Sequence, residues 1–135
     1  MATRVGVLGG SGYIGAELLR LVAGHPELEV VQVTAGANVG VAVGTLYPSL
    51  ASAYPGLTYE ATDPAGLDGL DVVFAALPHG ESQQLMPALV GRVEHVVDLA
   101  ADFRLSEDDY ATWYGEPHGA PDLLGAKLTS VALDA

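Results

Sequence analysis

The feature that most constrains the fold of this chain is a glycine-rich turn near the N-terminus, VGVLGGSGYIG at positions 5–15. Residues 4–8 lead into it as a short run of aliphatic and β-branched side chains, which is typical of a strand. From Tyr13 onward apolar residues recur at helical spacing, until Gly24 and Pro26 end the pattern. The sequence therefore predicts a strand, a tight turn and a helix in immediate succession.

The glycines in this turn are spaced for binding a phosphate. They satisfy both G-x-G-x-x-G and G-x-x-G-x-x-G, patterns in which glycine permits the tight turn, the close approach of a pyrophosphate and close helix–strand packing. A tight turn without a ligand is the alternative. Residues 28–34 read as a second strand and complete a βαβ unit, so we favour dinucleotide binding. The predicted cofactor-binding residues of the turn are Gly9, Gly10, Ser11, Gly12, Tyr13, Ile14 and Gly15.

The second half of the chain continues the alternation of strands and helices. Residues 71–77 form a nearly continuous apolar run, typical of a strand buried on both faces, and residues 78–80 mark its carboxyl end. Ser82 is predicted to cap a helix that runs through residue 90, and residues 94–99 supply another strand.

Residues 35–64 have a weaker pattern, because glycines and prolines interrupt it. Only residues 58–61 within them are compatible with a short strand. Taken together, the elements predict a Rossmann-like α/β fold, in which a doubly wound, mostly parallel sheet carries helices on both faces.

The end of the second predicted strand bears on the choice of cofactor. An acidic residue there would hold the ribose 2′-hydroxyl of NAD, but residues 34–38 (TAGAN) are neutral. This favours NADP, with Thr34 and Asn38 as candidate hydrogen-bond donors to its 2′-phosphate. No arginine or lysine lies nearby in the sequence to bind that phosphate, so the preference rests on the absence of repulsion alone.

Two further groups of candidate residues follow predicted strands. Pro78 and His79 come after the strand at 71–77, where ligands of open α/β sheets bind, so His79 is a candidate neighbour of the nicotinamide or substrate. An ordinary loop histidine is the alternative. Asp98, Asp102 and Arg104 cluster after the next strand; here we favour a structural interpretation, with Asp102 as a helix cap and Arg104 in an ion pair.

Composition excludes several classes of function. The 135 residues suit one domain, and their net charge of −12 argues against nucleic acid or an anionic membrane as the main partner. A small anionic ligand needs only a local positive potential. Because we find no signal-peptide core and no apolar stretch long enough for a membrane span, we expect a cytoplasmic protein. The chain has no cysteine, which excludes disulfides, thiolate metal sites and a cysteine nucleophile; we expect neither a metal site nor a catalytic residue.

Several segments resemble N-acetyl-gamma-glutamyl-phosphate reductase, in the same order through about residue 124. They include DVVFAALPHG at 71–80 and DLAADFRL at 98–105, which are more specific than the glycine turn. The related aspartate-semialdehyde dehydrogenase fits these two motifs less well. The other matching segments are GGSGYIGAELLRL at 9–21, HP at 25–26, YPSL at 47–50 and WYGEPHGAPDLL at 113–124.

The resemblance implies an NADP-dependent oxidoreductase of arginine biosynthesis, which reduces an acyl phosphate to a semialdehyde through a thioester on a cysteine. In that family the cysteine lies in a P-G-C-type motif downstream of the matching segments, and the activating histidine lies later still. Ala100 stands where the family often has serine. We therefore expect residues 1–124 to be the dinucleotide-binding domain, residues 125–135 to be a divergent tail, and the substrate domain to be absent through truncation, a frameshift or deliberate excision.

Three interpretations of such a chain remain open. It is the cofactor-binding part of a reductase and inactive alone, or a free-standing nucleotide-binding or interaction module, or one half of an enzyme whose remainder is another chain. In each the expected partner is a dinucleotide, with the acyl-phosphate substrate binding only where the missing domain is supplied. A homo-oligomer is compatible with all three.

Overall fold

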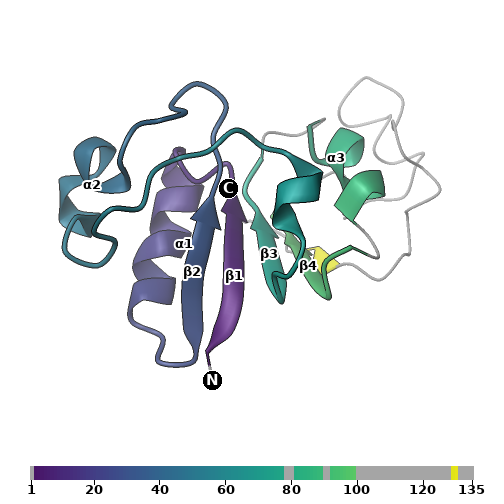
Figure 1. Ribbon diagram of the computed structural model, residues 1–135, viewed down its shortest axis with the longest axis horizontal. Helices are drawn as coiled ribbons and strands as arrows, with labels where there is room; N and C mark the ends of the chain where they lie inside the picture. The colour runs from purple at the N-terminus through teal and green to yellow at the C-terminus, as the bar shows by residue number, and fades with distance from the viewer. Residues whose placement is uncertain (1, 78–80, 90–91, 100–128, 131–135) are drawn as a thin grey trace.

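A computed structural model of the protein describes residues 2–77, 81–89, 92–99 and 129–130 (Figure 1). It begins with the predicted βαβ unit: strand β1 (Thr3–Leu8), helix α1 (Tyr13–Ala23) and strand β2 (Leu28–Val33). Gly24 follows α1 directly; its amide donates to the Leu21 carbonyl oxygen, and the next amide, of His25, donates to that of Val22. The local pattern of apolar residues therefore predicted all three elements to within a residue.

The segment between β2 and the next strand contains only short helical turns. These are α2 (Val43–Leu46) and the two 3-10 helices η1 (Pro48–Leu50) and η2 (Pro64–Leu67). The sequence of residues 58–61 was compatible with a short strand, but these residues form none. Thr58 bridges Ala42 in antiparallel fashion while Glu60 bridges Thr34 in parallel fashion, so the segment changes partner before a ladder can form.

Three more strands and a helix make up the rest of the described chain: β3 (Val72–Ala75), α3 (Glu81–Leu89), β4 (His95–Asp98) and β5 (Thr129–Ser130). The prediction that Ser82 caps the helix was wrong. Helix α3 begins one residue earlier, so Ser82 lies inside its first turn. The carboxylate of Glu81 suits that first turn, because a negative charge is favourable at a helix N-terminus.

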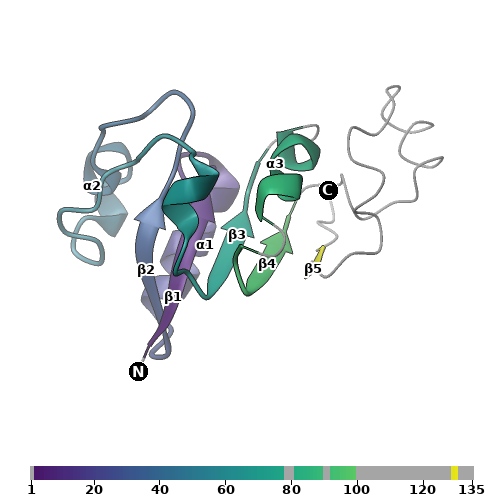
Figure 2. The same cartoon turned by 45° about the vertical axis from the view of Figure 1, so that its right-hand side comes forward.

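All five strands are parallel, in the order β2-β1-β3-β4-β5. Strand β1 thus lies between β2 and β3, and the chain reverses its direction of travel across the sheet after β2. In Figure 1 helix α1 lies behind β1 and β2 while η2 lies in front of the sheet, and Figure 2 shows the same arrangement from the side. The doubly wound fold is therefore confirmed.

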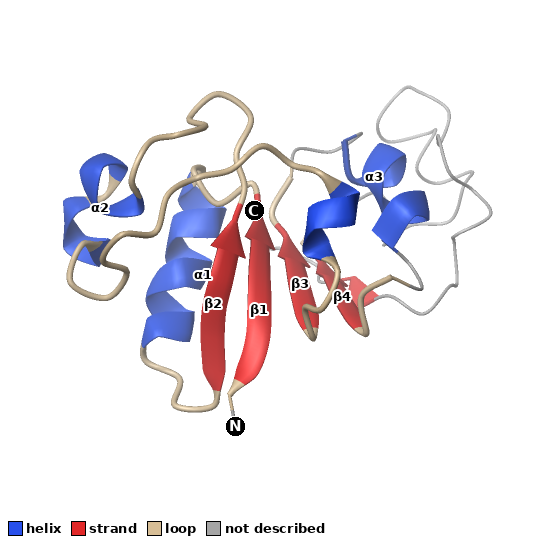
Figure 3. Ribbon diagram, in the orientation of Figure 1, coloured by secondary structure: helices blue, strands red, loops and turns tan. Residues whose placement is uncertain are grey.

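Side chains of β1 alternate between two hydrophobic clusters, one on each face. Val5 and Val7 pack with α1 in one cluster, whereas Leu8 packs with residues of η2, β3 and α3 in the other. Figure 3 distinguishes the helices and strands that carry these clusters. The alternation places helices on both faces of the sheet, as the sequence predicted.

Helix α1 is held to the sheet mainly by one side of its surface. Leu19 is fully buried in the cluster that contains Val5 and Val7, whereas Leu21, two residues further on, is 56% exposed.

Within the described residues no helix is long and apolar enough to cross a membrane.

We expect Leu19→Ala to lower the free energy of unfolding by about 3 kcal/mol, because it removes buried methyl groups and leaves a cavity. Leu21→Ala, on the exposed side of the same helix, should change it by less than about 0.5 kcal/mol. Urea unfolding followed by circular dichroism measures both. Equal losses in the two variants would contradict this account of how α1 packs.

Candidate dinucleotide-binding site

A cleft of about 510 Å³ opens at the carboxyl ends of β1 and β3, where the direction of the chain across the sheet reverses. Ligands of open α/β sheets bind at such a point. The glycine turn after β1 forms one side of the cleft, and the residues after β3 form the other. Its lining consists of Gly9, Ser11, Gly12, Tyr13, Ile14, Gly36, Ala76, Leu77 and Glu81.

Three glycines of the turn are required by packing within the protein. A Cβ atom on Gly9 would lie 2.4 Å from the Ala76 carbonyl oxygen, and φ at Gly9 is +73°, which disfavours other residues. A Cβ on Gly10 would lie 2.2 Å from Val33 Cγ2. A Cβ on Gly15 would lie 2.5 Å from the Gly9 carbonyl oxygen, so Gly15 lets the first turn of α1 touch the backbone of the turn before it.

Gly12 differs from these three, because no contact among the described residues requires it to be glycine. The nearest atom to a Cβ at this position would be the Gly9 carbonyl oxygen at 3.7 Å, an ordinary contact. Gly12 precedes the first residue of α1, and the amides of a helix's first turn have no acceptor within the helix. The backbone at Gly12 therefore borders the cleft with room beside it and hydrogen-bond donors next to it.

We expect Gly15→Ala to lower the melting temperature by several degrees, because its methyl group would overlap backbone atoms that cannot move aside. Gly12→Ala should leave the melting temperature within about one degree of the wild-type value, since its methyl group meets only an ordinary contact. Differential scanning calorimetry distinguishes the two variants. A larger loss for Gly12→Ala would show that packing, and not a ligand, explains that glycine.

Two tyrosines of the segment after β2 donate hydrogen bonds to carbonyl groups of the glycine turn. The sequence did not reveal this role. The Tyr59 hydroxyl donates to the Gly10 carbonyl oxygen at 3.2 Å, and the Tyr47 hydroxyl donates to the Ser11 carbonyl oxygen at 2.7 Å. Tyr54, in the same segment, donates to the Leu19 carbonyl oxygen within α1. The closely spaced tyrosines were the only signal in the sequence.

Tyr59 is the most enclosed of these phenols, with 1% of its surface exposed. Burial raises the pKa of Tyr59 to about 12, and the neighbouring Tyr47 adds to the rise. Burial also raises the pKa of Tyr54. The hydroxyl of Tyr59 therefore stays protonated over the whole neutral range and can donate a hydrogen bond.

The raised pKa of Tyr59 predicts a loss of stability in alkali. An unfolded tyrosine ionises near pH 10, so the folded state binds the proton more tightly and becomes less stable as the pH rises from about 10 to 12. Below about pH 10 both states are protonated and this contribution is complete. In thermal melts between pH 8 and 12, Tyr59→Phe should lose less stability than the wild type; parallel losses would contradict the assignment.

Thr34 and Asn38, the predicted donors to a 2′-phosphate, lie at and after the end of β2. Thr34 is fully buried, and its hydroxyl accepts a hydrogen bond from Thr62 Oγ1 at 2.8 Å. Its carbonyl oxygen accepts the Gly10 amide at 2.9 Å, which ties β2 to the glycine turn. Asn38 is half-buried in a turn that its carbonyl group closes with Val41. Contact of either side chain with a cofactor stays a prediction.

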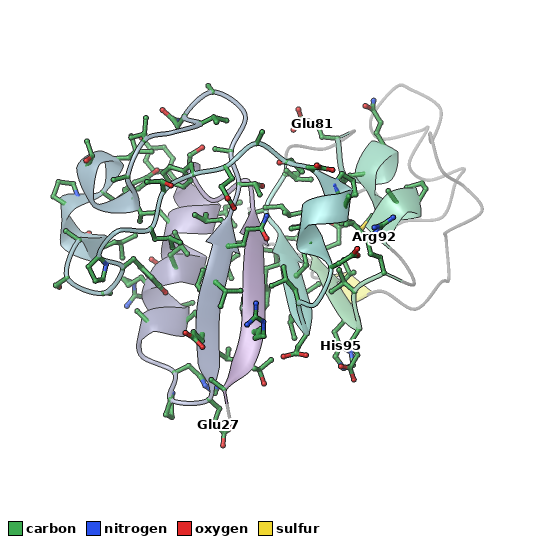
Figure 4. The ribbon with its side chains drawn as sticks, in the orientation of Figure 1. Glu27, Glu81, Arg92 and His95 are labelled. Atoms are coloured by element: carbon green, nitrogen blue, oxygen red, sulfur yellow. The ribbon has the colours of Figure 1, made fainter. Side chains whose placement is uncertain are left out.

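A second pocket, of about 320 Å³, adjoins the cleft past the end of β2. The two share Gly36, Leu77 and Glu81, and the second extends to Thr62, Gln84 and Leu85. In Figure 4 Glu81 lies at the carboxyl edge of the sheet, whereas Glu27 and His95 lie at the opposite edge. The cleft and the pocket together form an elongated site at one edge only.

The sequence from residue 4 to 128 matches the model of the family "Semialdehyde dehydrogenase, NAD binding domain". The chain belongs to this family. Over 122 residues it is 49% identical to N-acetyl-gamma-glutamyl-phosphate reductase of Pseudomonas fluorescens (strain Pf0-1) and 48% identical to that of Azotobacter vinelandii (strain DJ / ATCC BAA-1303). The matches cover 90% of this chain and 36% of each relative, so the chain spans about a third of the relatives' length.

Solved structures of related enzymes share the fold of this semialdehyde dehydrogenase domain. Aspartate semialdehyde dehydrogenase with NADP from Candida albicans has a TM-score of 0.69 at 18% identity and covers 96% of this chain and 42% of its own. Myo-inositol 2-dehydrogenase from Lactobacillus plantarum has a TM-score of 0.61 at 12% identity, covering 97% and 36%. At such low identity the likeness shows the fold alone. The resemblance to N-acetyl-gamma-glutamyl-phosphate reductase is confirmed by the closer relatives.

No basic side chain among the described residues lines the cleft. Arg92 pairs with Asp68 at 3.1 Å, Arg20 pairs with Glu17 on α1, and Arg4 is near the amino end of β1. None of these arginines lines either part of the site in the described chain. Within the described part of the chain, the groups that suit a bound anion are therefore the backbone amides and the positive end of the α1 dipole.

Of the other residues that the sequence singled out, the structure describes Asp98. Asp98 ends β4 and is fully buried. Pro78, His79, Asp102 and Arg104 lie outside the described residues. Among the residues that the structure does describe, no group of three or more histidine, aspartate or glutamate side chains could hold a metal ion.

Proposed function

We propose that this chain binds NADP(H) as the cofactor domain of an N-acetyl-gamma-glutamyl-phosphate reductase. The observation that supports it best is the position of Gly12, which borders an open cleft at the switch point of the sheet and, among the described residues, meets only one ordinary contact. The family is one of NAD-binding domains, and the relatives at 48–49% identity carry the reductase name.

The cofactor would lie along the elongated site with its pyrophosphate over Gly12. Amides of Tyr13 and Ile14 in the first turn of α1 would donate to the phosphate oxygens, and the Ser11 hydroxyl is close enough in sequence to add a further donor. The adenosine end would extend past Gly36 into the pocket of about 320 Å³. Pro78 and His79 would lie at the nicotinamide end.

We favour NADP over NAD because the segment after β2 offers no carboxylate. Residues 34–38 are neutral, and Gly36 among them lines both parts of the site. The ribose 2′-hydroxyl of NAD would lack its usual acidic partner there, whereas a 2′-phosphate would meet no repulsion from β2. Glu81, which lines both parts from α3, is the acidic side chain that a phosphate would have to avoid.

Reduction of an acyl phosphate would need groups that this chain does not contain. When bound, the cofactor supplies the hydride, and the residues of this chain bind and orient it. The reaction through a thioester also needs a thiolate, and the 135 residues include no cysteine. We therefore propose binding without turnover for this chain alone, with the nucleophile and the substrate site supplied by the part of the reductase that the relatives have in addition.

We expect the chain to bind NADPH with a dissociation constant below the millimolar range, as followed by enhancement and blue-shift of nicotinamide fluorescence. Gly12→Val should weaken binding by at least about tenfold, because its side chain would occupy the space beside the first-turn amides. Its melting temperature serves as the control for folding. NADH should bind more weakly than NADPH.

Three results would each count against a part of the proposal. Wild-type chain that leaves NADPH fluorescence unchanged up to millimolar concentration would overturn cofactor binding. Folded Gly12→Val with wild-type affinity would show that the dinucleotide binds elsewhere. Equal affinity for NADH and NADPH would overturn the cofactor preference while leaving the site intact.

A further inference from the structure

Three tyrosines in the segment between β2 and η2 each donate a hydrogen bond to a backbone carbonyl of the first βα unit. Two of them reach the glycine turn: Tyr59 at Gly10 and Tyr47 at Ser11. The turn itself consists largely of glycines, which have no side chains to restrict their backbone angles. Its orientation is therefore held from outside, by hydroxyl groups of residues 36 and 49 positions further along the chain.

Holding a carbonyl group also directs an amide. In a planar trans peptide the C=O and N–H bonds point in opposite directions. The carbonyl of Gly10 points toward the Tyr59 hydroxyl, so the N–H of Ser11 points away from that buried phenol. Ser11 lines the cleft, whereas Tyr59 is buried and does not line it.

The same reasoning applies to the next peptide. The Ser11 carbonyl points toward the Tyr47 hydroxyl, and the N–H of Gly12 points away from it. That amide donates a hydrogen bond of 3.3 Å to the Gly9 carbonyl oxygen, which closes the turn, so Tyr47 acts on the shape of the turn and not on an amide left for a ligand. The two phenols thus set the planes of two successive peptides at the mouth of the cleft.

We infer that Tyr47 and Tyr59 are positioning residues for the pyrophosphate, which hold the glycine turn so that the Ser11 amide and the first-turn amides of α1 face the bound dinucleotide. The inference rests on the proposed function. Neither tyrosine lines the cleft, so each acts through the turn and not by touching the cofactor. Tyr59 keeps its proton at neutral pH, and the donation to Gly10 is then permanent.

Tyr54 supplies a matched control from the same segment. Its hydroxyl also donates to a backbone carbonyl of the βα unit, but the acceptor is Leu19, in the body of α1. Tyr54 lines a separate hollow beside β2 and the end of α1, which shares no residue with the cleft. Removing its hydroxyl costs a comparable hydrogen bond without freeing the turn.

The test compares Tyr47→Phe, Tyr59→Phe and Tyr54→Phe in the 135-residue chain, by fluorescence titration with NADPH. Tyr47→Phe and Tyr59→Phe should each weaken binding by about tenfold, since one net hydrogen bond no longer orders the turn. Tyr54→Phe should stay within about twofold of the wild type. Because Tyr47 is only half-buried, its variant keeps the test decisive if Tyr59→Phe folds poorly.

A second ligand separates positioning from general destabilisation. Adenosine 2′-monophosphate has no pyrophosphate, so its affinity, measured by displacement of NADPH, should be the same in all folded variants. If the tyrosines merely stabilise the domain, both affinities would fall together. Thermal melts of each variant supply the matching change in stability.

The outcomes keep the two proposals apart. Wild-type binding with equal NADPH affinity in all three variants would overturn the inference alone, as would an equal fall in affinity for the two ligands. A wild-type chain that does not bind NADPH would overturn the proposed function and the inference with it. A fall confined to NADPH, in the Tyr47 and Tyr59 variants, supports both.

Discussion

The structure depends on the close approach of helix α1 to the backbone at the end of β1. Gly15 makes this possible, because any side chain there would overlap the Gly9 carbonyl and the Gly10 backbone. The contact brings the N-terminus of α1 to the carboxyl ends of β1 and β3. The first-turn amides of the helix, which have no acceptor within it, therefore lie at the mouth of the cleft.

This arrangement explains how a strongly acidic domain is suited to an anionic ligand. The chain has a net charge of −12, and the described arginines lie away from the cleft. Backbone amides and the α1 dipole act only at short range, so they create a local positive potential without changing the charge of the surface. The direction of such amides matters for binding a phosphate, and the hydrogen bonds of Tyr47 and Tyr59 restrain the turn that precedes them.

Much of the fold, and half of the candidate site, followed from local sequence. The apolar periodicity and the glycine spacing predicted β1, α1 and β2, since each depends on neighbours within a few residues. The sequence predicted Ser82 as the helix cap, whereas the helix begins at Glu81. The prediction failed because an acidic residue suits a first turn as well as a serine suits a cap. Residues 58–61 were compatible with a strand, but their bridges go to two different partners, a matter of tertiary contacts.

The sequence by itself determined the family, the doubly wound fold and the glycine turn, because these depend on residue order and short-range sterics. Only the tertiary structure decided which glycines are required by packing and which one borders open space. It also decided that the Thr34 side chain lies beneath the surface and that Tyr47 and Tyr59 hold the turn. Those contacts join residues 28 to 49 positions apart, and no local pattern in the sequence specifies which distant backbone group a phenol or hydroxyl will meet.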